Sequence, residues 1–204
     1  MGKRDNGDNK KLDLVEEDFE NEVKLNQLYL SIISKYKDYI EQKEQKSLSE
    51  LPSLIIPTNE IIMAKVNSIK LHFQNYNYNK DFYKASILAF DFVKDNIKSI
   101  TMPIKYWLTP DETILFGFGD IIDKNVLLTS LLIALGNHST KVLIIEEFNI
   151  EKIYTYCEYK NNIILFNVEN DIKIYKNLKS VLKNLNLNDD VNIYAFNNLG
   201  SNTI

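Results

Sequence analysis

The stretch PDETILFGFGDIIDKNVLLTSLLIALG, residues 110–136, decides how the rest of the chain must fold. Asp120 precedes a long apolar run and Asp123 follows three residues later, so both carboxylates can accept the free N–H groups of a first helical turn. Both acids also favour the positive end of a helix dipole. Gly136 is typical of the position just beyond a helix end. The pattern predicts a helix from Ile121 to Leu135 that is apolar nearly all round and therefore buried in the centre of a domain.

The composition sets limits on the class of protein. The 204 residues carry a formal net charge of −4, 45% of them are hydrophobic, and one is cysteine. This balance is that of a globular protein, and it disfavours a broadly basic nucleic-acid surface while leaving a local basic patch open. The N-terminus has no apolar leader, and no run approaches the ~20 apolar residues of a membrane helix. We therefore expect a cytoplasmic protein without a membrane anchor or an internal disulfide.

The sequence predicts three parts in the chain. Residues 1–14 are polar and predict a disordered tail. Residues 15–50 form an extension, in which apolar side chains at helical spacing predict a helix from about 16 to 45. A domain spans 51–204. Its first segment, 51–60, holds two prolines and predicts an extended strap.

Helices are predicted before the central helix and strands after it. The first helix follows a cap at Thr58 or Asn59, and the second spans about 81–98. Strands are predicted at 141–148, 151–160, 163–168 and 191–196, with a short helix near 177–185 before the last of them. Asn161-Asn162 indicates a hairpin. Helices first and a sheet second is an α+β pattern.

The opening stretch also resembles the first active-site block of a known family. That block combines proline, glutamate, threonine, two glycines and two aspartates, and this chain has them at matching spacing: Pro110, Glu112, Thr113, Gly117, Gly119, Asp120 and Asp123. The chain thereby resembles the transglutaminase-like superfamily within the papain-like cysteine enzymes, over about residues 80–170. The resemblance implies an α+β fold, with a helical N-terminal half packed on a small antiparallel sheet around a buried central helix.

The resemblance also implies where an active site would lie and that it is degenerate. The family's nucleophilic cysteine begins the central helix, and that position is Ile121 here. The family's second block, H-x-W-x-E, matches Tyr154, Tyr156 and Glu158, so tyrosine replaces the histidine base. The orienting aspartate falls at Asn167 or Glu169, and strand parity does not choose between these two. Without nucleophile and base, the activated-nucleophile mechanism is lost.

Other residues do not restore the chemistry. If Tyr154 and Tyr156 face the former cleft, alternation along the strand turns Cys157 away from it. Trp107, Tyr154 and Tyr156 either line a remnant cleft or fill it as aromatic core. Asp120 and Asp123 are better explained as helix caps than as metal ligands. The two histidines and one cysteine lie far apart in the sequence and form no zinc pattern, so we expect no metal and no cofactor.

The sequence therefore predicts a non-catalytic, transglutaminase-like protein that binds a protein or peptide. Two alternatives stay open. The first is nucleic-acid binding, because a DNA-damage recognition protein of excision repair resembles the same superfamily and lacks the catalytic residues. The second is an enzyme with a relocated mechanism, which would need a polar side chain with a shifted pKa in a pocket near Ile121. Trp107, Asp120, Tyr156 and Glu158 are the predicted cleft residues.

Overall fold

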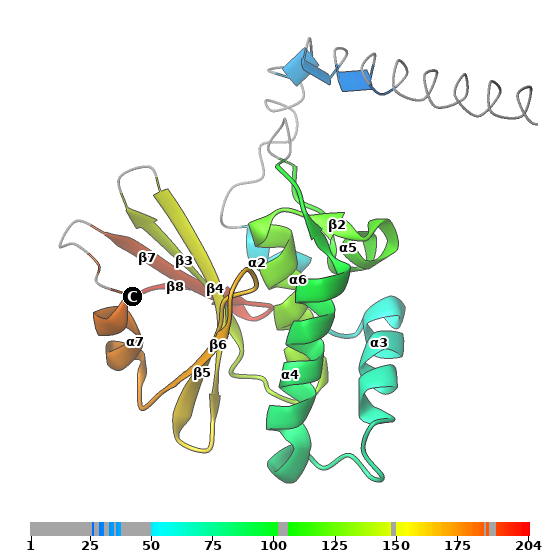
Figure 1. Cartoon of the computed structure of the whole chain (residues 1–204). Coiled ribbons are helices and arrows are strands. Elements are labelled where there is room, and N and C mark those ends of the chain that lie inside the picture. The colour runs from blue at the N-terminus through cyan, green and yellow to red at the C-terminus, as the bar shows by residue number, and fades with distance from the viewer. Residues whose placement is uncertain are drawn as a thin grey trace, which may run out of the picture. The chain divides into compact units, whose positions relative to one another are not determined.

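The structure is a computed structural model, and it describes residues 26, 29, 30, 33, 34, 36, 37, 50–101, 106–147, 150–185, 187 and 191–204 (Figure 1). The chain divides into two units, one with residues 1–45 and 102–106 and the other with 46–101 and 107–204. In the first unit, the described residues between 26 and 37 are helical, and Tyr29, Leu30 and Tyr36 are exposed. The predicted tail and the rest of the predicted N-terminal helix lie outside the described residues.

The second unit is built on a six-stranded antiparallel sheet. Its order is β6-β5-β4-β3-β7-β8, and every neighbouring pair is antiparallel. The strands are β3 Lys141–Glu147, β4 Ile150–Tyr159, β5 Asn162–Phe166, β6 Ile172–Tyr175, β7 Asn192–Asn197 and β8 Gly200–Thr203. Helix α7, Leu178–Asn184, connects β6 on one side of the sheet to β7 on the other.

Six helices and one small strand pair complete the described part of this unit. The helices are α2 Leu51–Leu54, α3 Glu60–Lys70, α4 Tyr78–Asn96, α5 Pro110–Phe116, α6 Ile121–Ala134 and α7. Two short parallel strands, β1 Lys98–Ser99 and β2 Phe118–Gly119, pair next to the start of α6.

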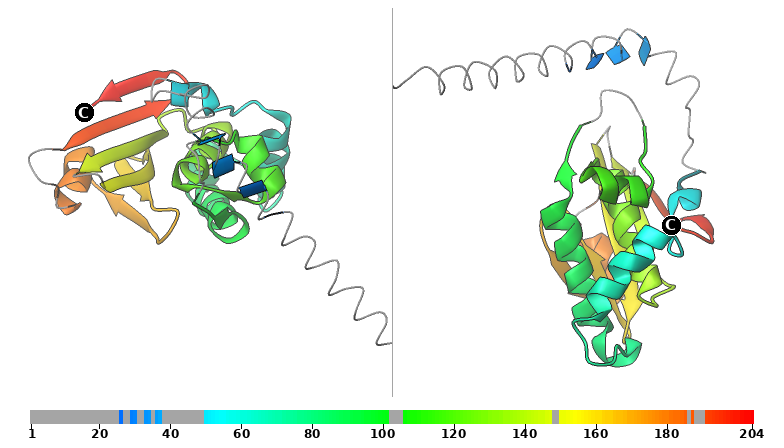
Figure 2. Two further views of the ribbon diagram at one scale, coloured as in Figure 1. Left: turned by 90° about the horizontal axis from the view of Figure 1, so that it is seen from above. Right: turned by 90° about the vertical axis from the view of Figure 1, so that its right-hand side faces the viewer.

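The central helix α6 lies between the sheet and helices α3, α4 and α5. It contacts α3, α4 and α5 as well as β3 and β4, and nearly all of its residues are buried (Figure 2). Its leucines lie in an apolar cluster with α3, α4 and β5. Helix α7 packs in a different cluster, on the opposite face of the sheet. The predicted α+β class, with helices and an antiparallel sheet around a buried central helix, is confirmed.

Local signals explain where the structure agrees with the sequence and where it differs. Asn59 caps α3 as predicted, since its side chain accepts a hydrogen bond from Ile61 N at 2.9 Å. The predicted strap at 51–60 is wrong at its start, because Pro52 lies in the first turn of α2, where a missing N–H is tolerated. Helix α4 begins at Tyr78, three residues before the predicted start.

Several short elements were missed, among them α2 and the β1–β2 pair, and one turn is shifted. Helix α5 was not predicted, although Thr109 and Glu112 form a capping box at its start. Strands β6 and β8 lie at the sheet edges and are only four residues long, so their period-2 signal is weak. The β4–β5 turn is formed by Lys160 and Asn161, both with positive φ, one residue earlier than predicted.

Candidate functional site at the start of the central helix

Two carboxylates fix the start of α6. Asp123 N donates to Asp120 Oδ1 at 2.8 Å, and Asp120 N donates to Asp123 Oδ2 at 2.9 Å, which completes a reciprocal capping box. Leu108 N donates to Asp123 Oδ1 at 2.9 Å and ties the preceding segment to the helix start. The prediction that both acids act as helix caps is therefore confirmed.

A close backbone approach leads into this turn. A Cβ added to Gly119 would lie 2.9 Å from the Cβ of Asp123, which is closer than real Cβ atoms come, so the position requires glycine. Gly117 ends α5 with φ +70°, in the left-handed region that glycine tolerates best. The two glycines of the matched block thus have backbone roles at the helix start.

Burial changes the acidity of the capping pair. Asp123 is almost fully buried, and burial together with the nearby charge of Asp120 raises its pKa to about 7. Burial also raises the pKa of Asp120, against the effect of the hydrogen bonds that it accepts from backbone N–H groups. The pair therefore favours a shared proton near neutral pH, because two carboxylates in one desolvated site resist carrying two charges.

Apolar side chains pack around Ile121, the first residue of α6. Ile121 is half-buried and packs where two apolar clusters meet. One cluster contains Ile153 of β4, and Trp107 packs against it. The other contains Val168, which follows β5 and is fully buried. None of these side chains can take up or release a proton.

The structure corrects the predicted face of β4. Thr155 Oγ1 donates to Asn125 Oδ1 of α6 at 3.0 Å, so Thr155 faces the central helix. Tyr154 and Tyr156 lie instead in the cluster with Val181 of α7, on the other face. The expectation that Tyr154 lies beside Ile121 was wrong. Because side chains alternate along a strand, a match displaced by one residue moves the whole set to the opposite face.

The two predicted positions for the orienting acid lie together in the turn after β5. Asn167 and Tyr154 line a small pocket of about 180 Å³ next to α7. Asn167 Oδ1 accepts a hydrogen bond from Glu169 N in the turn after β5, and Glu169 is exposed. The charge of Glu169 reaches the Lys124 amine of α6, whereas Tyr154, the matched base position, packs on the face of β4 away from that helix.

A buried polar network that the sequence did not reveal joins α6 to β4. Asn125 Nδ2 donates to Ile121 O at 2.8 Å, and the Thr129 and Thr155 hydroxyls lie 3.3 Å apart. Asn125, Thr129 and Thr155 have no exposed surface. Their hydrogen bonds satisfy one another, so the network stabilises the contact between helix and sheet and presents no group to a substrate.

A second buried polar contact lies one residue earlier on the helix. Lys124 is 3% exposed, and its Nζ donates to Ser99 Oγ at 3.1 Å. Burial lowers the pKa of this amine, and the charge of Glu169 partly opposes the shift. Polar residues within an otherwise apolar helix could have indicated both contacts from the sequence. The sequence does not show which strand would supply their hydrogen-bond partners.

The single thiol faces the central helix and is inaccessible. Cys157 is fully buried in the cluster that contains Leu131 and Leu135. The prediction that Cys157 faces away from the central helix was therefore wrong, for the same reason that the predicted face of Tyr154 was wrong. Burial raises its pKa to about 12, which keeps the thiol protonated at neutral pH.

The other predicted residues are dispersed. His72 follows α3 and His138 follows α6, and both are exposed. Among the described residues, no three His, Cys, Asp or Glu side chains lie close enough to hold a metal ion. Nor does any helix in the described ranges have the length and apolarity to cross a membrane.

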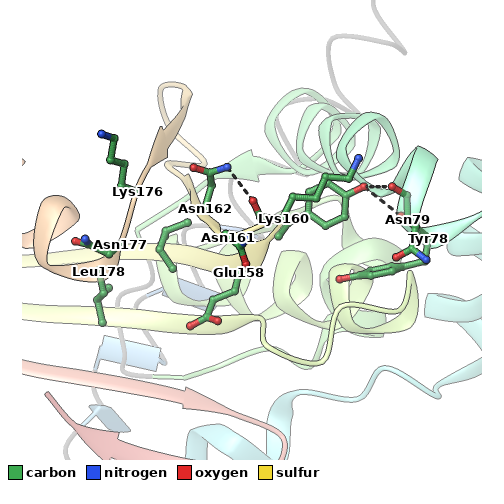
Figure 3. A pocket seen from close by; sticks show the side chains of 11 residues that line it. Tyr78, Asn79, Glu158, Lys160, Asn161, Asn162, Lys176, Asn177 and Leu178 are labelled. Atoms are coloured by element: carbon green, nitrogen blue, oxygen red, sulfur yellow. Dashed lines mark hydrogen bonds between the residues drawn. The ribbon is translucent and has the colours of Figure 1, made fainter.

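A larger pocket lies elsewhere, at the β4–β5 hairpin (Figure 3). Its volume is about 570 Å³, and it is formed by Tyr78 and Asn79 at the start of α4, residues 158–163 of the hairpin, and residues 176–178 at the start of α7. Of the predicted cleft residues, only Glu158 lines it. Sequence reasoning missed this pocket because its walls come from three segments that are far apart in the chain.

Comparisons with known proteins return structures only. No family model and no curated protein matches the chain. Legionella pneumophila LapG is similar in its EGTA-treated form, at 16% identity and TM-score 0.42 over 70% of this chain and 85% of LapG. The calcium-bound form is 18% identical, with TM-score 0.41 over 68% of this chain and 86% of LapG. A further LapG structure is 16% identical, with TM-score 0.39 over 66% of this chain and 82% of LapG. No residue role in this chain follows from a likeness at these scores.

The buried acid pair gives the protein a pH-dependent stability. The pKa of Asp123 is raised on folding. The protonated carboxyl therefore contributes fully to the free energy of unfolding below the unfolded-state pKa of about 4, and this contribution is lost as pH rises through about 7. The free energy of unfolding, measured with urea across this range, should fall less steeply in Asp123→Asn than in the natural protein. Asp91→Asn, at an exposed position, should keep the natural slope. Equal slopes in all three proteins would contradict the shifted acid.

Cys157 should react slowly with alkylating reagents. At neutral pH we expect iodoacetamide to modify it more than about 100-fold more slowly than a free thiol, because both burial and the raised pKa oppose attack. Unfolding in urea should restore the ordinary rate, and Cys157→Ala should take up no label. A rate in the folded protein above that of a free thiol would show an activated cysteine.

Proposed function

We propose that this protein is a non-catalytic, transglutaminase-like domain that binds a protein or peptide. The observation that carries the proposal is the apolar packing of Ile121 at the start of α6, where the resembled family has its nucleophile. A helix N-terminus favours a thiolate, but isoleucine offers no group to ionise there. The neighbouring Trp107 and Ile153 supply neither an acid nor a base.

The shifted acid and amine near Ile121 favour structural roles over a relocated mechanism. Both oxygens of Asp123 accept backbone N–H groups, and the amine of Lys124 is bound to Ser99. Neither residue lines either pocket described above. A general base must reach a proton of the substrate, and these groups are engaged within the fold.

The hairpin pocket is the surface that we assign to binding. Asparagine side chains from α4, the hairpin and the α7 junction offer the donors and acceptors that a peptide backbone requires. Lys160 and Lys176 contribute two ammonium groups, against one carboxylate from Glu158. This local excess of positive charge, in a chain of net charge −4, favours peptides with acidic side chains.

Catalytic inactivity is the first expected outcome. The purified protein should neither hydrolyse peptide amides nor cross-link glutamine to amines above the background rate, because the nucleophile and base are absent from the start of α6. Cys157→Ala should behave identically. Turnover that this substitution abolished would reveal a working thiol, and turnover that survived it would favour the relocated-enzyme alternative.

Peptide binding is the second expected outcome. Short random peptides selected by display on the natural protein should be rich in Asp and Glu. They should bind at least ~10-fold more weakly to the double variant Lys160→Glu, Lys176→Glu, because two attractive charges become repulsive.

A matched double variant controls for the change in net charge. Lys84→Glu with Lys98→Glu alters two exposed lysines outside the pocket and should leave peptide affinity unchanged. Failure to select any peptide, or equal loss in both double variants, would refute the assignment. Tighter binding of single-stranded DNA than of the selected peptides would favour the nucleic-acid alternative.

A further inference from the structure

The two edges of the sheet differ in charge. Strand β6 carries Lys173, which pairs with Asp171 at 4.0 Å. Strand β8 consists of Gly200, Ser201, Asn202 and Thr203, all exposed and none charged. Edge strands usually carry charges, prolines or bulges that prevent other strands from pairing with them. β6 has charged protection of this kind, and β8 lacks it.

The hydrogen bonds of β8 identify the backbone groups at its free edge. Ile204 N donates to Ile193 O at 3.0 Å, so this pair is hydrogen-bonded within the β7–β8 ladder. In an antiparallel ladder the bonded pairs alternate, so Asn202 and Gly200 also point their N–H and C=O groups toward β7. Ser201 and Thr203 therefore point theirs outward. Within the part of the chain that the structure describes, no strand pairs with that edge (Figure 2, red).

We propose that β8 is a self-association surface, on which a second copy of this chain adds its own β8 antiparallel across a two-fold axis. With the axis at Asn202, Ser201 of each copy lies opposite Thr203 of the other. Both are outward-pointing residues, so each of these two pairs exchanges both of its N–H···O bonds. The result is one sheet that continues through the dimer, with the same patch used on both copies.

The side chains of β8 suit this symmetric register. On the axis, Asn202 meets Asn202 of the second copy, and two amides can hydrogen-bond to each other. Gly200 lies opposite Ile204, which is 45% exposed. A Cβ added to Gly200 would meet nothing within 4 Å, so the isoleucine has room to pack there.

The same operation on β6 is unfavourable. Asn167 N donates to Asp171 O, so alternation points the backbone groups of Ile172 and Ile174 outward on that strand. A two-fold axis between them places Lys173 directly opposite Lys173 of the second copy. Like charges in directly opposed positions destabilise strand pairs. Charge therefore selects β8 over β6 as the edge that can join two copies.

The mass of the 204-residue chain in solution, measured by sedimentation over a concentration series, tests the proposal. A four-residue strand buries little surface, so the natural protein should shift from monomer to dimer as concentration rises. Asn202→Lys puts two ammonium groups on the axis without changing the backbone, and should weaken the dimer at least tenfold. Thr203→Pro removes an outward N–H, which the β7–β8 ladder does not use, and should also weaken it.

A proline on the other edge is the matched control. Ile174→Pro removes an outward N–H from β6 and should leave the dimer intact. Urea unfolding of each variant separates loss of association from loss of fold. A natural protein that stays monomeric throughout, or a dimer that Asn202→Lys leaves unchanged, would overturn the proposal. The proposal would also be overturned if the natural protein were monomeric and Asn202→Lys abolished its binding of peptides. That result would assign the β8 edge to a peptide.

Discussion

Helix α6 is apolar on nearly all of its faces and must be buried on all of them, and this constraint organises the described domain. Leu127, Leu128, Leu131 and Leu132 are fully buried, and each such side chain contributes roughly 1.5–3 kcal/mol when removed from water. One layer cannot cover a helix on all sides. Helices α3, α4 and α5 cover one side and strands β3 and β4 the other, which makes the three-layer arrangement a consequence of the composition of α6.

The start of this helix is fixed by backbone hydrogen bonds and covered by apolar side chains. The capping pair, the glycine that allows close approach, and the tie from Leu108 orient the first turn. Ile121 then presents an aliphatic side chain to the surrounding apolar residues. Deeper along the helix, Asn125 and Thr155 bond to each other instead of to a ligand. Packing and mutual hydrogen bonding therefore occupy the position where the resembled family carries out its reaction.

The surfaces available for binding lie away from that centre. The hairpin pocket and the β8 edge are formed by short segments whose polar groups the core does not use. Lys160 and Asn161 hold the hairpin tip in a tight turn, so the pocket wall follows a defined backbone. The polar groups at these two places therefore lie outside the packing that fills the start of α6.

Signals that act within a few residues were sufficient to determine the longer helices and the four longest strands of the sheet. Asp120 and Asp123 marked the start of α6, Asn59 marked that of α3, and the β-branched runs marked β3 to β5. Helix α5 carried such a signal in its capping box, and it was overlooked. The short edge strands β6 and β8 had too few residues to show a period.

The partners of β4 were decided only by tertiary structure. Ile153, Thr155 and Cys157 are buried on the face against α6, whereas Lys152 and Tyr154 are half-buried and Glu158 is exposed on the face beside α7. This alternation marks the two faces only weakly, because threonine and tyrosine side chains suit either face of a strand. A displacement of one residue in the family match was therefore enough to place Tyr154, instead of Thr155, on the face toward α6. The same displacement turned Cys157 away from α6 in the prediction. The hydrogen bond between Thr155 and Asn125 fixes the choice, because a buried hydroxyl requires a partner and α6 supplies one. The sequence by itself determined that the central helix begins with an isoleucine; the packing of the sheet against that helix determined which residues surround it.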